Sequence, residues 1–336
     1  MLSISCVGHL RSPSDWTKQT ITAVESDVFR KLNSLLTQSF STMHPMSNKD
    51  TLQSFLFDGT DVRGEINTLT GSYQEIMALQ QYPQPIACLF GEFLAAASLI
   101  GASLKYAGMV TVQAMGDGPI SAIMAECTAE QQIRGIVRGN ITDFKDTASH
   151  SLEEVLGRGT LAVTIEPDKG ERYQGVVAMD ADNLSGCLEH YFSQSAQLPT
   201  MIKLAASTDS VSGMLIQQMP VSENTEKARA DWQHLTTLLE TLKSSEQLDL
   251  SHNDQLYRLF HQDNVRLFQP KMISFNCSCS ETRTAQALIY LGRDELLETI
   301  AEQGVVSVTC QFCAQQYEFN EAAIKALFHS DGDVVH

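Results

Sequence analysis

Apolar and polar residues alternate along several segments in the first two thirds of the chain. Residues 110–114 and 161–165 place apolar side chains at every second position, which is the spacing of half-buried strands. Residues 184–192 instead repeat at helical spacing, behind Asp182 or Asn183 as a helix cap. Strands and helices are interspersed here without regular strand–helix–strand units. The pattern therefore predicts an α+β fold with a largely antiparallel sheet over residues 46–222.

The pattern changes between residues 223 and 276, where narrow apolar stripes follow helical spacing. A second short helix is predicted from Ser251 onwards. The longer helix carries its apolar stripe on Trp232, Leu235, Leu238, Leu239 and Leu242. Short helices are marginal on their own in water, so these helices must dock on a neighbouring surface. We interpret residues 223–276 as a metastable helical linker.

The last segment, residues 277–336, is predicted to alternate short helices with short strands. Helices are expected over residues 285–290, 294–303 and 321–328, and strands over residues 305–308 and 316–319. Gly304 is a helix stop signal, and Asn320 can cap the last helix. A segment of this size can hardly build a core unaided, so a structural metal is physically reasonable.

Residues 1–45 differ from the rest of the chain in charge. They hold four basic and three acidic residues, whereas the whole chain has a formal net charge of -17. Our hypothesis is that this leader is disordered, or absent from the native protein because translation starts at Met46. Targeting is the functional alternative, but the acidic residues are unusual for a transit peptide. They are Asp15, Glu25 and Asp27.

Composition and charge narrow the class of protein. The chain has 336 residues, 43% apolar and 19% charged, which is typical of a soluble protein with more than one domain. Its acidity weighs against a nucleic-acid binder, because phosphate contacts need clustered Lys and Arg. Residues 86–104 are nearly all apolar but contain Glu92, so we interpret them as a buried helix and predict no membrane partner. No secretory signal opens the chain, and a cytoplasmic protein with reduced thiols is expected.

Four of the eight cysteines form two tight pairs near the end of the chain. The pairs are Cys277-Ser-Cys279 and Cys310-Gln-Phe-Cys313, a C-x-C followed by a C-x2-C. Together they supply the ligand set of a tetrahedral zinc site, Zn2+ being the predicted cofactor. The alternatives are four free thiols with coincidental spacing, or an iron–sulfur cluster, for which C-x-C spacing is unusual.

The C-x-C pair has a further chemical consequence. With one residue between them, the two sulfurs lie close enough to join if the metal departs, and such a small-ring disulfide would be strained and easily reduced. Thiolates held by a metal are also reactive towards oxidants. Loss of zinc would remove the free energy that folds this segment, so the site can act as a switch.

These features resemble the heat shock protein 33 family of redox-regulated bacterial holdase chaperones. The four cysteines meet the family pattern of C-x-C, roughly thirty residues, and C-x2-C. Other stretches also resemble the family: Val62-Arg-Gly-Glu65, residues 113–119 (QAMGDGP) and residues 170–175 (GERYQG). The resemblance runs from about Thr51 to Phe328, and Met46 falls near the expected family start.

The resemblance implies how the protein works. Reduced, zinc-bound protein would be an inactive monomer. Oxidation would form the disulfides Cys277–Cys279 and Cys310–Cys313, release zinc and unfold both the zinc-binding segment and the linker. The resulting dimers would hold unfolding client proteins. Our own hypothesis is that the freed linker offers clients the apolar side chains of Trp232, Leu235, Leu239 and Leu242.

Rival functions come from other classes of protein. The cysteine pairs could form a nucleic-acid-binding zinc ribbon, against which the acidic balance argues. They could also belong to a zinc enzyme, but a catalytic site keeps one coordination position open, and four thiolates close the shell. The histidines form no HExxH motif, so no enzyme activity is predicted. Arg63 and Glu65 are assigned structural roles.

Overall fold

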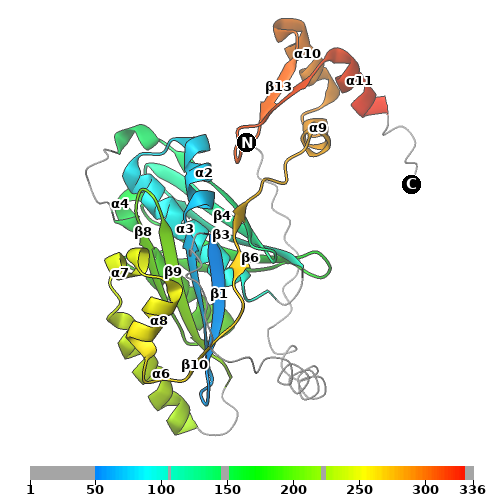
Figure 1. Ribbon diagram of the computed structural model, residues 1–336. Coiled ribbons are helices and arrows are strands. Elements are labelled where there is room, and N and C mark those ends of the chain that lie inside the picture. The colour runs from blue at the N-terminus through cyan, green and yellow to red at the C-terminus, as the bar shows by residue number, and fades with distance from the viewer. Residues whose placement is uncertain (1–49, 105–106, 145–150, 221–224, 330–336) are drawn as a thin grey trace. The chain divides into compact units, whose positions relative to one another are not determined.

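The computed structural model describes residues 50–104, 107–144, 151–220 and 225–329 (Figure 1). The predicted leader, residues 1–45, lies outside the described residues. The described residues belong to one compact unit, Asn48–His336.

Two six-stranded sheets, with strands drawn from residues 51–275, form the larger part of the fold. The first sheet has the strand order β10-β1-β2-β9-β8, with β11 also paired to β1, and all of its pairs are antiparallel. Its strands are β1 (Thr51–Phe57), β2 (Val62–Leu69), β8 (Thr200–Ala206), β9 (Val211–Gln218), β10 (Val265–Leu267) and β11 (Lys271–Met272).

The second sheet has the order β12-β5-β4-β3-β6-β7, in which only the β12–β5 pair is parallel. Its strands are β3 (Gly108–Gly116), β4 (Ile120–Thr128), β5 (Gln132–Gly139), β6 (Gly159–Pro167), β7 (Tyr173–Ala178) and β12 (Ser274–Phe275). The predicted alternation at residues 110–114 and 161–165 falls within β3 and β6. The expected α+β class with largely antiparallel sheets is confirmed.

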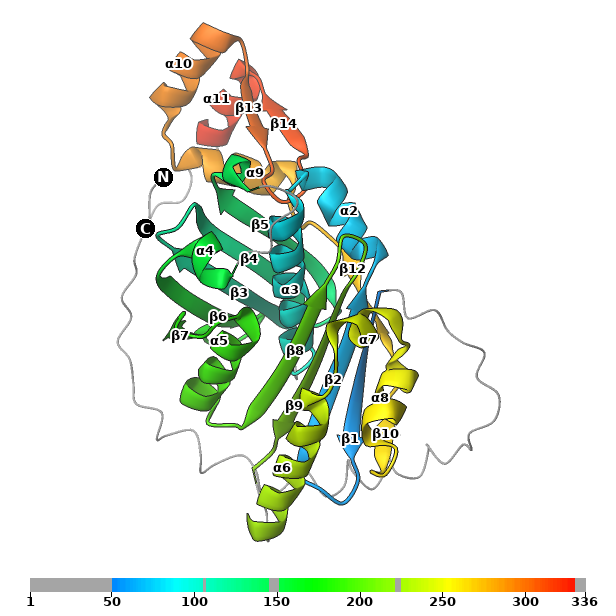
Figure 2. The same ribbon diagram turned by 90° about the vertical axis from the view of Figure 1, so that its left-hand side faces the viewer.

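One apolar helix, α3 (Gln84–Gly101), lies between the two sheets and packs on strands of both (Figure 2). It is long and apolar enough to cross a membrane by length and composition alone, but 72% of that window is buried inside the protein. Its residues, including Phe90, Phe93 and Leu94, join one continuous apolar core with both sheets. This burial agrees with the interpretation of the segment as a core helix.

The remaining helices of this part lie around the sheets. Asn183 caps α5, its side chain accepting a hydrogen bond from the backbone N–H of Gly186 at 2.9 Å, as one of the two predicted caps. The helical elements are α2 (Gly71–Gln80), the 3-10 turn η2 (Ile141–Asp143), α4 (Leu152–Leu156), α5 (Leu184–Tyr191) and the π-helical turn η3 (Phe192–Ala196).

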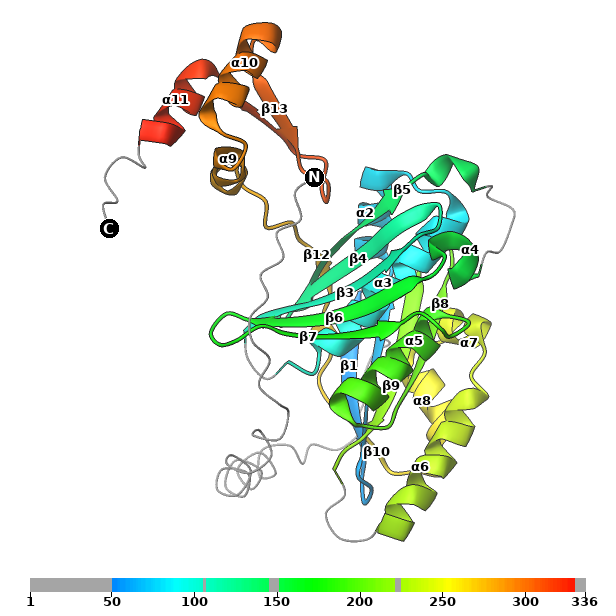
Figure 3. The same cartoon turned by 180° about the vertical axis from the view of Figure 1, so that it is seen from behind.

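The predicted linker contains α6 (Thr225–Glu240), α7 (Ser244–Asp249) and α8 (His252–Phe260), which lie along the first sheet (Figures 2 and 3). Their apolar residues form a second cluster with Phe55, Ile66 and Ile216 of that sheet. Alternation along β2 explains the position of this cluster, because Val62 and Ile66 face the helices while Arg63 and Glu65 point to the opposite face.

The C-terminal elements have their own small apolar cluster. They are α9 (Glu281–Ile289), α10 (Arg293–Gln303), β13 (Val306–Thr309), β14 (Gln316–Phe319) and α11 (Glu321–His329). The cluster contains Leu288, Phe319 and Ile324. Gly304 ends α10 at a φ of 82°, in the left-handed region that glycine tolerates, as expected of a stop signal.

Candidate metal centre

The four paired cysteines converge on one point. Cys277 and Cys279 follow β12, and Cys310 and Cys313 lie in the turn between β13 and β14. All four Sγ atoms lie within 4.8 Å of one another. Across the two pairs, the Sγ atoms of Cys277 and Cys310 are 3.7 Å apart and those of Cys279 and Cys313 are 3.3 Å apart. Thiolates at the corners of a tetrahedral zinc site are about 3.8 Å apart, so the arrangement fits a four-sulfur metal site.

Backbone hydrogen bonds shape the turn that carries the second pair. The N–H of Cys310 donates to the carbonyl of Gln315 at 2.8 Å, and the N–H of Ala314 donates to the carbonyl of Cys310 at 2.9 Å. Ala314 has a φ of 57°, so the chain turns sharply just after Cys313. The antiparallel register of Thr309 with Gln316 then fixes this turn at the end of the hairpin.

The thiols differ in how readily they ionise. Burial opposes ionisation of Cys279, but hydrogen bonds from Tyr317 and the other three thiols outweigh it and lower the pKa of the Cys279 thiol to about 7. The Tyr317 hydroxyl donates to Cys279 Sγ at 3.2 Å. Burial raises the pKa of the Cys277 and Cys313 thiols. Of these three thiols, Cys279 is therefore the one that most readily becomes a thiolate, the reactive form.

Sequence reasoning missed two side chains of this centre. Tyr317 is four residues past Cys313 on a predicted strand. The only available signal was that it lies two positions before Phe319, and therefore on the same, inward face of the strand. Arg134 on β5 donates from Nη1 to Ser278 Oγ at 2.8 Å. No local signal connects it with residues far along the chain, although a charge inside the apolar strand around Ile133 and Ile136 is unusual.

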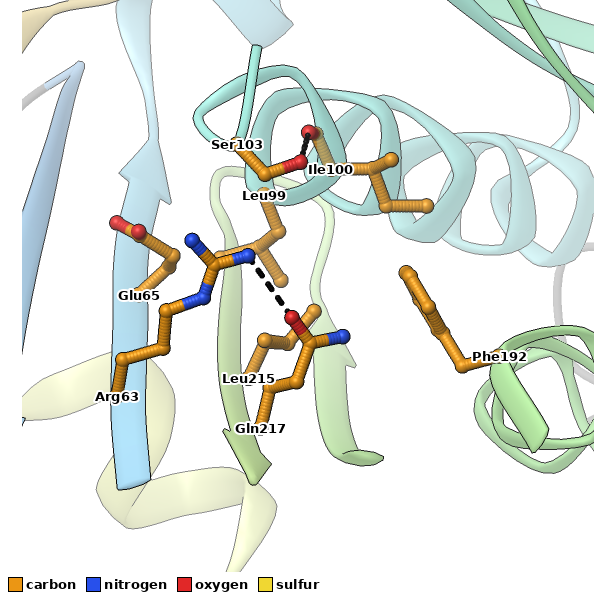
Figure 4. Close-up of a pocket in the computed structure, with 8 residues that line it drawn as sticks. All are labelled: Arg63, Glu65, Leu99, Ile100, Ser103, Phe192, Leu215 and Gln217. Carbon is orange, nitrogen blue, oxygen red and sulfur yellow. Dashed lines mark hydrogen bonds between the residues drawn. The ribbon is translucent and has the colours of Figure 1, made fainter. Parts of the chain in front are cut away.

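A second polar cluster lies in the first sheet, around a cavity large enough for about one water molecule (Figure 4). Arg63 Nη2 donates to Gln217 Oε1 at 2.8 Å. Glu65 is buried, and burial raises its pKa to about 7, against the lowering effects of Ser54, Arg63 and Lys271. Among the described residues, Glu65 Oε2 and Arg63 Nε have no hydrogen-bond partner. Both residues line this cavity from β2, and the structural roles expected of them stay a prediction.

Three other cysteines lie away from the metal centre. Cys127 and Cys187 are buried, whereas Cys88 on α3 is half-buried. Burial raises the pKa of all three thiols. They are consequently poor nucleophiles compared with Cys279.

Comparison with known proteins now decides the family. The sequence model described as Hsp33 protein matches residues 50–320. The chain belongs to the Hsp33 family. The 33 kDa chaperonin of Pseudomonas aeruginosa LESB58 is 44% identical over 292 residues, which cover 85% of this chain and 97% of the relative. That of Shewanella woodyi is 42% identical over 283 residues, covering 84% and 96%.

A solved structure supports the same fold. The heat shock protein 33 homolog from Thermotoga maritima, also a 33 kDa chaperonin, superimposes with a TM-score of 0.72 at 21% sequence identity. The match covers 84% of this chain and 99% of that one. The resemblance seen in the cysteine pattern is thus confirmed, and membership of the Hsp33 family supports a chaperone function for the chain.

Proposed function

We propose that the chain is a redox-regulated holdase that binds unfolding proteins and prevents their aggregation under oxidative stress. The reduced, zinc-bound form is the inactive monomer, and the oxidised form is the active dimer. The single observation that carries the proposal is the convergence of the four Sγ atoms to within 4.8 Å. A site of this kind is closed to substrate, and only its sulfurs offer a reaction.

Zinc bound by the four thiolates would cross-link two parts of the chain that β12 and the β13–β14 hairpin bring together. The C-terminal segment has few buried apolar residues of its own, so this cross-link would supply much of its folding free energy. Removing the thiolates as ligands therefore removes the main support of the segment.

The oxidation is balanced as two separate two-electron reactions. In each pair, two zinc-bound thiolates lose two electrons in total, and one sulfur–sulfur bond forms. One equivalent of hydrogen peroxide per pair accepts the two electrons, takes up two protons from the solvent and is reduced to two waters. The products are the disulfides Cys277–Cys279 and Cys310–Cys313, neither of which retains a thiolate.

The linker, residues 223–276, is proposed to carry the signal from the zinc-binding segment to clients. In the docked linker Leu235, Leu239 and Leu242 are buried against the first sheet, and Trp232 packs at the edge of the same cluster. We propose that unfolding of the C-terminal segment, residues 277–336, releases these four side chains. A client then covers apolar surface that the sheet covered before.

The proposal also covers the protein's cellular location, its partners and whether it is an enzyme. We propose a cytoplasmic protein that is not an enzyme and that uses neither nucleic acid nor membrane as partner. The net charge of -17 supports the absence of a nucleic-acid partner. The closed set of four thiolates supports a regulatory site over a catalytic one. The core domain of the proposal is residues 46–222.

The test uses the full chain in its reduced, zinc-loaded form. Zinc and free thiols are quantified before and after hydrogen peroxide, and each sample is added to a chemically denatured client whose aggregation is followed by light scattering. We expect one zinc per chain and no suppression of scattering before oxidation. After oxidation we expect zinc in solution, loss of four thiols and strong suppression of scattering.

Two results would contradict the proposal. One is reduced protein that contains no metal. The other is equal suppression of client aggregation by the reduced and oxidised samples. A Cys187→Ser variant is the matched control, because it removes a buried thiol outside the cysteine cluster and should respond to peroxide as the wild type does.

A further inference from the structure

One arginine of the core sheet contacts both cysteine pairs. Arg134 lies on β5, and its Nη1 donates to Ser278 Oγ at 2.8 Å and lies 4.0 Å from Cys277 Sγ. The same guanidinium stacks over the ring of Phe312 at 4.4 Å from the ring centroid. Ser278 stands between the cysteines of the first pair, and Phe312 stands between those of the second. Arg134 therefore spans the two halves of the metal centre.

The guanidinium is held in this place by a second interaction behind it. Arg134 Nε donates to Glu126 Oε2 at 2.5 Å, and these two residues are direct neighbours on β5 and β4. Their side chains are only 18% and 10% exposed. An ion pair this sheltered, on adjacent strands of a sheet, gives the guanidinium a fixed position before it meets the cysteine pairs.

Neighbouring contacts reinforce the same junction on each pair. On the second pair, Arg138 Nη2 donates to Gln311 Oε1 at 2.7 Å, and Gln80 Nε2 donates to the carbonyl of Gln311 at 2.8 Å. On the first, the N–H of Asn276 donates to the carbonyl of Ile133 at 3.1 Å, continuing the β12–β5 pairing up to Cys277. Side chains and backbone groups of the core thus contact residues within or next to each cysteine pair. Among the core residues named here, only Arg134 contacts both pairs.

Charge favours the same arrangement. Residues 277–336 contain three basic and nine acidic residues, and a four-thiolate zinc site adds two negative charges. A guanidinium is always charged and can stack on an aromatic ring and donate hydrogen bonds at the same time, which an ammonium group does less well. Arg134 offers both contacts from a single side chain.

We propose that Arg134 is a positioning residue of the metal centre, which clamps the two cysteine pairs together from the core sheet and slows their separation. It sets how readily the metal is lost, and so how much oxidant is needed. Only that last consequence rests on the proposed chaperone function. The clamp itself is a property of the reduced, metal-bound protein and can be measured without any client.

The experiment measures zinc release from reduced full-length protein to an excess of a chromogenic chelator, with no oxidant present. Arg134→Gln removes the charge and the stacking, and we expect about a tenfold faster release, because a charged hydrogen bond and a cation–π contact are lost. Arg134→Lys keeps the charge and should recover part of the slow release. Arg158→Gln, which removes one exposed positive charge before β6, is the matched control and should release zinc as the wild type does.

A second variant keeps the test decisive if Arg134→Gln folds poorly. Phe312→Leu removes the aromatic ring from the other side of the contact and should also speed release. If the two side chains act through their contact, the double variant releases zinc no faster than about the faster single variant. Thermal unfolding of the core is followed in parallel, so that loss of folded protein is separated from loss of metal.

Equal release rates for the wild type, Arg134→Gln and Phe312→Leu would overturn the clamp, even if oxidation still activates the chaperone. The reverse result is equally clear. Faster release in the variants, with no client holding by any oxidised sample, would uphold the clamp and refute the proposed function. A mere anchoring role predicts faster amide exchange in β12 with an unchanged release rate, and this too would refute the clamp.

Discussion

The core between the two large sheets and the C-terminal region are stabilised by different means. In the core, α3 alone buries thirteen residues between the sheets, Phe90 and Phe93 among them. The C-terminal region has six buried apolar residues, and its two-stranded sheet has no second sheet packed on it among the described residues. Apolar burial is the main favourable term in folding. A region with so little of it must take its stability from elsewhere, and the four converging sulfurs are the available source.

The linker is held in place by a mixture of apolar burial and buried polar contacts, unlike either of these two regions. Leu235, Leu239 and Phe260, which dock its helices on the first sheet, are as well buried as the residues of the core, but this contact also includes buried polar groups. Gln247 Nε2 donates to the carbonyl of Lys203 at 2.9 Å, and His252 Nε2 is 3.0 Å from Thr68 Oγ1. Gln255 Oε1 has no partner among the described residues. Buried polar groups make docking specific but contribute little net stability, so the linker helices α6, α7 and α8 can be released without unfolding the sheets.

The largest expected effect comes from removing a ligand of the metal centre. Cys310→Ala should leave three thiols and lower metal affinity so far that the C-terminal region loses its structure, because structural zinc contributes about 10 kcal/mol or more to such regions. Hydrogen exchange under reducing conditions should show β13 and β14 unprotected and β3, β4 and β6 unchanged. Protected amides in β13 of the metal-free variant would contradict the view that the metal, and not apolar burial, stabilises the C-terminal region.

A smaller effect is expected from truncating one buried phenylalanine to alanine in each region. Phe90→Ala should destabilise the core by about 3–5 kcal/mol and leave zinc affinity unchanged, because the ring is fully buried between the sheets. Phe319→Ala should weaken zinc binding and leave core unfolding unchanged. Urea unfolding of the core and a zinc competition titration check the two variants. Loss of both properties in either variant would show that the regions are not independent.

Local patterns predicted much of this architecture, and long-range contacts account for what they missed. The strands at residues 110–114 and 161–165, the caps at Asn183 and Asn320, and the stop at Gly304 all depend on a few neighbouring residues. The four sulfurs were also predictable, since each pair is close in sequence. Arg134 was not, because its place depends on the parallel pairing of β12 with β5, more than 130 residues away along the chain.

Low pH should also weaken the docking of the linker helices, by less than the substitutions above, because it favours protonation of the buried His252. Burial lowers the pKa of His252 to about 4, from 6.5, so the docked state resists its protonation. The resulting stabilisation is complete above pH 6.5 and is lost as the pH falls from there to 4, by ~3 kcal/mol at most. In a Trp16→Phe background, Trp232 fluorescence should report undocking across this window. His252→Asn removes the titrating group, and a variant with the same pH dependence as wild type would refute the prediction.

The smallest effect is expected at Glu65, inside the first sheet. Burial raises its pKa to about 7, so its contribution to stability is complete below pH 4.5 and is lost as the pH rises through 7. Glu65→Gln should therefore stabilise the core at pH 8, by ~1–2 kcal/mol, and have little effect at pH 4.5. Glu153→Gln, at an exposed position of α4, is the control. Equal urea midpoints for wild type and Glu65→Gln at pH 8 would contradict the expectation.

The central claim is that the state of the four thiols controls the order of the linker as well as that of the C-terminal region. The most direct measurement is hydrogen exchange by mass spectrometry, on reduced zinc-loaded protein and on the same sample after peroxide. We predict that α6, α8, β13 and β14 lose protection together as zinc is released, while β3, β4 and β6 stay protected. Full protection of α6 and α8 after both pairs have been oxidised would contradict the claim.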